Sequence, residues 1–159
     1  MKVVLLSSAL SIHTVRWANA LSDAGLDVTV ISQHPQVEVM NDSVKVHLFP
    51  FRGVIGYFTM VPAVKKLIKK IKPDIINAHY ASGYGTTARL VNYHPWLLSV
   101  WGSDVYDFPY LSTIHKRLIK GNLLAADAIA STSHCMAVQT HSLTDTLGKI
   151  AITPFGVDT

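Results

Sequence analysis

The chain has 159 residues, of which 49% are hydrophobic and only 15% are charged. A composition this apolar excludes a disordered chain, and the length suits one domain with one well-filled core. No segment reaches the roughly 18–20 consecutive apolar residues that a membrane-spanning helix needs. The single cysteine, Cys135, excludes an internal disulfide and a cysteine-based zinc site, and it fits a reducing, cytosolic setting. The net charge is +4.

The N-terminus imitates a secretory signal. Met1 and Lys2 precede an apolar run, and the small residues 18–20 look like a cleavage site. However, His13 and Arg16 interrupt the stretch where a signal should be uncharged. We therefore expect residues 3–6 to form a buried first strand.

Short β-branched runs alternate with helical patterns along the chain. In chain order we expect a strand at 3–6, a helix at 13–24, strands at 28–31 and 44–49, a helix at 62–72, a strand at 75–78, a helix at 85–93, a strand at 97–101, a helix at 111–126, a strand at 128–131, a helix at 136–146 and a strand at 150–152. Gly25 is placed to end the first helix, and Pro73 ends the second. The alternation in residues 44–49 is typical of a strand near an edge of the sheet.

Continuous apolar strands that alternate with helices predict a parallel sheet covered on both faces. The fold class is therefore α/β, a Rossmann-like doubly wound sheet. Ligands of such sheets bind beyond the carboxyl ends of the strands. The segments expected at that edge are residues 7–13, 79–85, 101–108, 131–134 and 154–158.

The first of these loops contains no glycine, which argues against a dinucleotide-binding G-x-G-x-x-G motif and against a P-loop. Its small side chains and the following helix start suit a phosphate or a sugar hydroxyl. Two interpretations of Ser11 and His13 stay open. Either Ser11 caps the helix and His13 is a surface group, or both residues contact a ligand.

The second loop, residues 77–85, combines aromatic and polar side chains directly after a buried strand. His79 and Tyr80 suit a sugar, because an aromatic face covers the ring and polar groups reach its hydroxyls. A tyrosine-rich turn closed by two glycines is the alternative.

The third loop begins with Trp101 and Gly102, and Gly102 can adopt a backbone conformation that other residues resist. Ser103 and Asp104 follow, either displayed toward a ligand or, for Asp104, capping a turn. The surrounding residues do not form the G-x-S-x-G pattern of a serine hydrolase. The eight histidines show no H-x-x-x-H pair, so we expect no metal site.

A lysine cluster is predicted on one face of the helix at 62–72. At about 100° per residue, one face carries the apolar side chains and the opposite face carries Lys65, Lys66, Lys69, Lys70 and Lys72. This cluster is either a solvated helix face or a contact with an anionic membrane surface. No motif of a nucleic-acid-binding protein accompanies it.

Taken in order, several motifs resemble the N-terminal domain of a GT-B glycosyltransferase of glycosyltransferase family 4. They are HTVRWA at 13–18 with Leu21 and Gly25, KPDIINAH at 72–79, WGSD at 101–104, ADAI at 126–129 and PFGVD at 154–158. The resemblance covers nearly the whole chain. It implies that residues 1–159 are an acceptor-binding domain that ends at an interdomain hinge. The donor-binding C-terminal domain would lie outside this chain. Without that domain, this chain should not catalyse sugar transfer.

The family's activity implies retaining transfer of a sugar from a nucleotide-sugar donor to a glycan or lipid-linked acceptor, without a metal cofactor. Cell-surface polysaccharide assembly, in the cytoplasm or on the inner face of the membrane, is the expected setting. The resemblance and strand-end position assign Asp104 and His13 as catalytic candidates. The acceptor-binding candidates are Ser11, His79, Tyr80, Trp101, Gly102 and Ser103.

Two departures from the family pattern affect these assignments. The first loop lacks the family's two glycines, so the resemblance does not assign a contact with donor phosphates to this loop. Trp101 replaces a histidine found in some relatives, which favours stacking on a sugar over proton transfer. A non-catalytic Rossmann-like binding module and a GT-B epimerase are the alternative functions.

Overall fold

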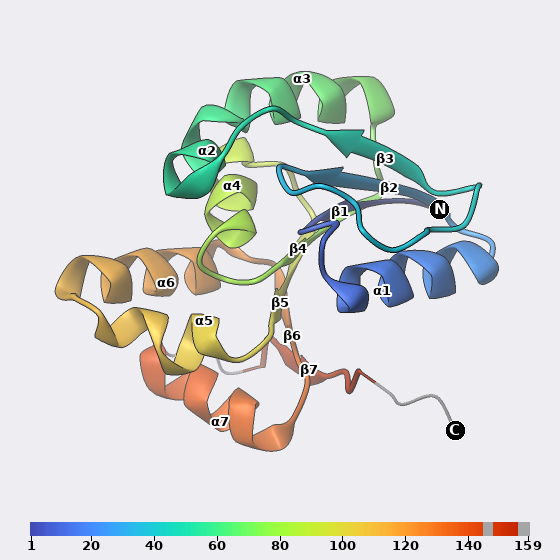
Figure 1. Cartoon of the computed structure of the whole chain (residues 1–159). Helices are drawn as coiled ribbons and strands as arrows, with labels where there is room; N and C mark the ends of the chain where they lie inside the picture. The colour runs from blue at the N-terminus through green and yellow to red at the C-terminus, as the bar shows by residue number, and fades with distance from the viewer. Residues whose placement is uncertain (145–147, 156–159) are drawn as a thin grey trace.

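The computed structural model describes residues 1–144 and 148–155 and contains one parallel seven-stranded sheet (Figure 1). The strand order is β3-β2-β1-β4-β5-β6-β7. The strands are β1 (Lys2–Leu6), β2 (Asp27–Ser32), β3 (Lys45–Leu48), β4 (Ile75–His79), β5 (Trp96–Val100), β6 (Ala128–Ser131) and β7 (Ile150–Ile152). The helices are α1 (Ile12–Asp23), α2 (Gly53–Thr59), α3 (Val61–Ile71), α4 (Tyr84–Val91), α5 (Ser103–Tyr106), the 3-10 helix η1 (Phe108–Tyr110), α6 (Thr113–Ala125) and α7 (His134–Leu143).

The chain winds outward from β1 in two directions. It first runs through α1 and β2 to the edge strand β3, and then returns over α2 and α3 to β4, on the other side of β1. Leu6 of β1 is in register with Ile31 of β2 and with Ala78 of β4. The strand order therefore reverses between β1 and β4, which is where a doubly wound sheet offers a binding crevice.

Two apolar clusters form the core, one on each face of the sheet, where the helices pack against the strands. On one face, Val15 and Ala18 of α1 pack against β1 and β2. On the other face, α3, α4 and α6 bury residues that include Ile68, Ala88 and Leu123 against the central strands. The prediction of a doubly wound α/β sheet with helices on both faces is confirmed. No helix among residues 1–144 and 148–155 is long and apolar enough to cross a membrane.

The twelve predicted elements are present, with shifted ends. The helix after Pro62 ends at Ile71, because Lys72 adopts a left-handed φ of 51° immediately before Pro73. The helix expected from residue 111 begins at Thr113, after Ser112, whose hydroxyl accepts a hydrogen bond from the His115 N–H. The last predicted helix begins earlier, after Ser133, and its final residues lie outside the described part of the chain.

The structure adds three short helices, α2, α5 and η1, that the sequence patterns did not indicate. In α2 the two glycines and the run of apolar residues hide any helical periodicity. Gly56 is buried there because the Gln33 side chain occupies the space that a Cβ atom would need. The helix is formed by packing and not by intrinsic propensity.

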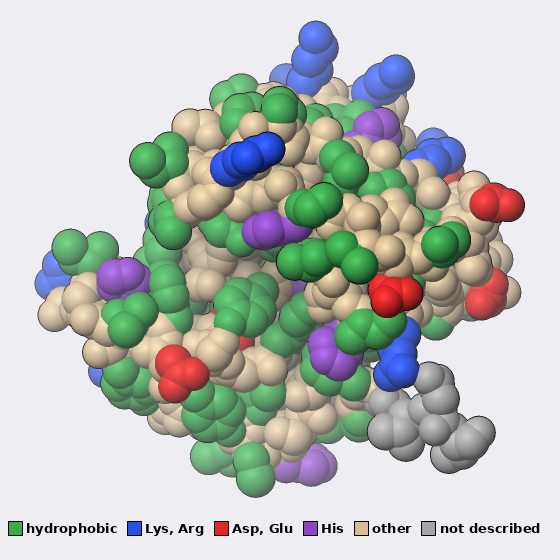
Figure 2. Space-filling view, viewed as in Figure 1, with side chains coloured by type: hydrophobic (Ala, Val, Ile, Leu, Met, Phe, Trp, Pro, Cys, Tyr) green, Lys and Arg blue, Asp and Glu red, His purple; other side chains and the backbone are tan. Residues whose placement is uncertain are grey.

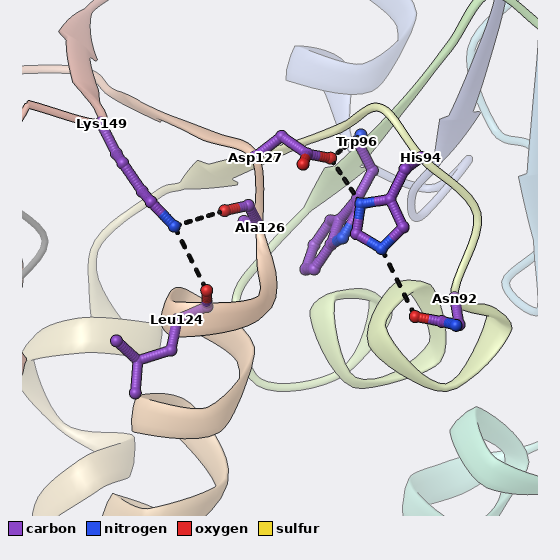
Figure 3. Close-up of polar contacts among 7 residues, drawn as sticks. All are labelled: Asn92, His94, Trp96, Leu124, Ala126, Asp127 and Lys149. Atoms are coloured by element: carbon purple, nitrogen blue, oxygen red, sulfur yellow. Dashed lines mark hydrogen bonds and ion pairs between the residues drawn. The ribbon is translucent and has the colours of Figure 1, made fainter.

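The amino ends of β5 and β6 carry a set of polar contacts far from the carboxyl ends (Figure 3). The Asp127 carboxylate lies 2.7 Å from His94 Nδ1 and accepts a 2.7 Å hydrogen bond from the Trp96 N–H. Nearby, Lys149 Nζ donates to the carbonyls of Leu124 and Ala126. These contacts join the start of β5 to the α6–β6 turn and to the segment before β7.

Candidate functional site

The switch point between β1 and β4 is closed by a chain of three buried polar side chains. His79 is the last residue of β4 and is 1% exposed. Its Nδ1 lies 2.9 Å from the Ser7 hydroxyl, which lies 2.7 Å from the hydroxyl of Thr14 on α1. These hydrogen bonds fix the orientation of the His79 ring relative to β1 and β4.

Burial keeps His79 uncharged. Desolvation, with a smaller contribution from the neighbouring His13, lowers the pKa of His79 to about 3. Among the described residues, no group hydrogen-bonds His79 Nε2 or the buried Nδ1 of His13. Buried polar atoms normally have partners, so these two nitrogens are candidate hydrogen-bonding atoms for a ligand.

Trp101, at the end of β5, is the centre of an aromatic cluster that we define as His13, His79, Tyr80, Trp101 and Phe155. The Trp101 ring centroid lies 4.9 Å from that of His79, 5.6 Å from His13, 5.5 Å from Phe155 and 6.5 Å from Tyr80. His13 and Phe155 stack at 4.0 Å with their planes 9° apart. Four segments distant in sequence therefore meet at the carboxyl edge of the sheet.

Asp104 connects two of these segments, the loops that follow β4 and β5. The side chain is fully buried, and its carboxylate accepts hydrogen bonds from the N–H groups of Ala81 at 2.7 Å and of Gly102 at 2.8 Å. The Trp101 N–H donates to the same carboxylate at 3.1 Å. Burial raises the pKa of Asp104, although the backbone hydrogen bonds act in the opposite direction. The carboxylate thus holds the β4–α4 loop against the β5–α5 loop.

The glycine in this turn is required by its backbone conformation. Gly102 has φ 142° and ψ −92°, in a region that residues with a Cβ atom avoid. The unusual conformation expected of Gly102 is confirmed, and Ser103 is exposed, but Asp104, which was expected to be displayed beside Ser103, is buried. The exposed Ser103 hydroxyl hydrogen-bonds the Tyr80 hydroxyl, so a further side-chain contact joins the two loops.

Ser11 occupies the N-cap position of α1, but its side chain makes no capping hydrogen bond. It is half-buried, and its N–H donates to the Ser8 carbonyl. Of the eight predicted site residues, four lie in the aromatic cluster, and Gly102, Ser103 and Asp104 contact its loops. Ser11 is placed beside the cluster by its position two residues before His13.

Phe155, Ser7 and Thr14 belong to the site but were not predicted as site residues. Phe155 lies in a segment expected at the carboxyl edge, yet nothing in its local pattern indicates that it stacks on His13. The rest of the predicted hinge motif, residues 156–158, lies outside the described part of the chain.

A second aromatic group, Tyr57 and Tyr84 with His34, lies next to the first along the sheet edge. The Tyr84 hydroxyl is 2.8 Å from His34 Nδ1, and burial raises the pKa of Tyr84 to about 12. The Tyr57 ring packs edge-on against Tyr84 at 5.1 Å. In residues 1–144 and 148–155, no group of three or more His, Cys, Asp or Glu side chains is arranged to hold a metal ion.

Comparison with solved structures shows the same half-molecule in larger proteins. Sucrose-phosphate synthase from Thermosynechococcus elongatus superposes with a TM-score of 0.79 at 15% identity, over 97% of this chain and 48% of that chain. Anabaena HepE, solved in complex with UDP-glucose, gives 0.68 at 13% identity, over 99% of this chain and 44% of that chain. A glycosyltransferase from Rickettsia africae gives 0.64 at 15% identity, over 96% of this chain and 42% of that chain.

These identities establish the fold, one half of a GT-B structure, and the chain spans about half the length of these proteins. A comparison with curated protein sequences finds no significant match. The family model described as Glycosyl transferase 4-like matches residues 2–133, from the first strand to the loop after β6. The chain therefore belongs to the glycosyl transferase 4-like family.

Proposed function

We propose that this chain is the acceptor-binding half of a retaining glycosyltransferase. The enzyme moves a sugar from a nucleotide-sugar donor to a glycan or lipid-linked acceptor in cell-surface polysaccharide assembly. A second lobe, beyond the hinge, brings the donor. The observation that supports this function best is the convergence of His13, His79, Tyr80 and Trp101 at the strand-order switch.

The aromatic cluster suits a carbohydrate alcohol. Trp101 is half-buried and offers its ring to the apolar face of a sugar. The uncharged His79 and the neighbouring His13 hold ring nitrogens without partners among the described residues, and hydroxyl groups would supply those partners. His13 hydrogen-bonds a sugar hydroxyl or a donor phosphate oxygen.

The chemical step needs no strong base from this half of the enzyme. The acceptor oxygen bonds the anomeric carbon as the bond to the donor phosphate breaks, and the leaving phosphate takes the acceptor proton. The chain's contribution is positioning, which lowers the barrier by holding the reacting atoms in line.

Asp104 acts in this scheme as a positioning residue. Its buried carboxylate holds the Ala81 and Trp101 backbones together, so it orients the acceptor through the two loops that carry the aromatic cluster. Asp107 lies three residues after Asp104, at the C-cap of α5, and is exposed, so it offers a matched control.

The test is a screen of nucleotide sugars with the full-length protein, with products followed by mass spectrometry. We expect a new glycosidic product. Asp104→Ala should raise the acceptor KM more than the donor KM, whereas a purely structural loss would lower kcat and leave both KM values unchanged. Asp107→Ala should match the wild type.

Three results would contradict the proposal. Unchanged acceptor KM and kcat in Asp104→Ala would remove the role of Asp104. Interconversion of the donor with its epimer, without an acceptor product, would show an epimerase. Absence of any turnover with every donor would favour a binding module.

A further inference from the structure

The net positive charge of the chain comes from one segment. Residues 43–73 hold seven of the fourteen Lys and Arg residues and none of the ten Asp and Glu residues. The segment therefore carries +7 and the remainder −3, which together give the chain's +4. This segment comprises β3, α2 and α3, so the charge lies at one side of the fold.

The lysines of α3 have no anionic partners among residues 1–144 and 148–155. Lys65, Lys66, Lys69 and Lys70 are exposed, and none makes an ion pair or hydrogen bond to any of the described residues. They lie opposite Val64 and Ile68, which are buried against the sheet.

An apolar surface adjoins these lysines on α2. Val54 is 74% exposed, Ile55 73% and Phe58 46%. Burying such side chains is favourable, so their exposure on one short helix marks an interaction surface. The inner side of the same helix is anchored, because Tyr57 packs on Tyr84 and its carbonyl accepts a 2.7 Å hydrogen bond from Thr87 Oγ1.

The apolar and basic side chains share the outer side of the α2–α3 segment. Met60 joins the two helices with helical dihedral angles, and its N–H donates to the Gly56 carbonyl at 3.0 Å. Val54, Phe58, Lys65 and Lys69 are separated by four, seven and four residues, each close to whole helical turns. Hydrophobic side chains over α2 lie next to the Lys and Arg side chains along the top of the molecule (Figure 2).

We infer that this outer side, defined as Val54, Ile55, Phe58, Lys65, Lys66, Lys69 and Lys70, docks on an anionic lipid bilayer. The lysines contact phosphate headgroups, and the α2 side chains enter the boundary between headgroups and acyl chains. The combination selects this partner, because a basic face with adjacent apolar side chains matches the interfacial layer of an anionic membrane. A nucleic acid would use the lysines alone. The inference does not depend on the proposed enzymatic function.

Vesicle co-sedimentation tests the inference with the whole protein and two vesicle compositions, phosphatidylcholine alone and phosphatidylcholine mixed with phosphatidylglycerol. We expect binding to the anionic vesicles only, and weaker binding as salt is raised. Lys65→Gln with Lys69→Gln should lower the partition coefficient by about 25-fold, or about fivefold per lysine. Val54→Ser with Ile55→Ser should lower it by about tenfold.

Two matched controls are available on other helices. Lys116 and Lys120 are exposed lysines of α6, and Val138 is a 69% exposed apolar residue of α7. Lys116→Gln with Lys120→Gln, and Val138→Ser, should leave the partition coefficient unchanged. All substituted side chains are exposed, so the variants should keep the wild-type circular dichroism spectrum.

The inference is overturned by equal binding to neutral and anionic vesicles or by no binding to either. It is also overturned if the control pair loses as much binding as the α3 pair. If the lysine variants lose binding but Val54→Ser with Ile55→Ser does not, the surface binds polyanions in general and not a bilayer.

Discussion

His79 is a histidine that the fold keeps neutral. Because burial lowers its pKa to about 3 while an unfolded chain has a histidine pKa near 6.5, the unfolded state takes up the proton first as the pH falls. The stability that depends on neutral His79 is fully present above about pH 6.5, and is lost progressively as the pH falls toward the folded-state pKa.

We therefore expect His79 to contribute a pH-dependent loss of stability. At pH 5.5 it amounts to about 1.4 kcal/mol, one pH unit below the unfolded pKa. The measurement is urea unfolding of the wild type and of His79→Gln between pH 7.5 and 5. Between pH 7.5 and pH 5 the variant should lose about 2 kcal/mol less stability than the wild type. Parallel pH profiles for the two proteins would contradict the prediction.

At this scale the sequence predicted that the candidate residues would lie close together, but not how each side chain is oriented. His79, Trp101 and Asp104 follow apolar strands, and parallel strands place such residues at one edge. The sequence did not predict that the Asp104 carboxylate points inward to backbone N–H groups. That orientation depends on the path of two loops, as does the stacking of Phe155 on His13.

At the scale of elements, α2 is held by a close approach to the start of α4. A Cβ atom at Gly83 would lie 2.5 Å from Tyr57 Cζ, and the ring is wedged against Tyr84. Gly83→Ala should therefore destabilise the protein by about 1–3 kcal/mol through overpacking. In a Tyr57→Ala background the same substitution should cost much less, because the clashing ring is gone. Equal costs in both backgrounds, measured by urea unfolding, would show that Tyr57 is not the obstacle.

A second element-scale contact ties β5 to β6 at the amino ends (Figure 3). Partial burial raises the pKa of Asp127, but hydrogen bonds from the Trp96 N–H and His94 outweigh it and lower the pKa below 3.8. The unfolded state thus protonates first, so this stabilisation is present above about pH 4 and is lost as the pH falls through the lowered pKa.

Asp127→Asn should accordingly reduce stability near neutral pH, by less than about 1 kcal/mol because the pair is partly exposed. The difference from the wild type should shrink as the pH falls below 3.8. Thermal unfolding across this range checks it, and a constant difference at every pH would exclude the charge of Asp127 as the cause.

The elements themselves were predictable where a hydrophobic period or an end signal exists. Gly25 follows α1 with a φ of 83°, and Pro73 follows the end of α3, both as expected. The short helices α2 and α5 lack such signals. They exist because tertiary contacts, such as Gln33 beside Gly56, hold them.

At the scale of the whole molecule, alternation of strands and helices predicted the doubly wound sheet but not its strand order. The order places β1 beside β4, and this pairing brings Ser7 to His79 and His13 to Trp101. The same topology sends α2 and α3 to the side of the sheet, where residues 43–73 gather their charge. The fold thus places the proposed acceptor-binding edge and the proposed membrane-docking surface on different parts of the molecule.

The central claim is that the aromatic cluster binds the acceptor, and steady-state transfer kinetics of the full-length protein test it most directly. Trp101→Ala should raise the acceptor KM by about tenfold, the scale of one lost aromatic contact, with little change in the donor KM. Tyr110→Ala, at a 61% exposed tyrosine outside the cluster, should match the wild type. An unchanged acceptor KM in Trp101→Ala would contradict the account.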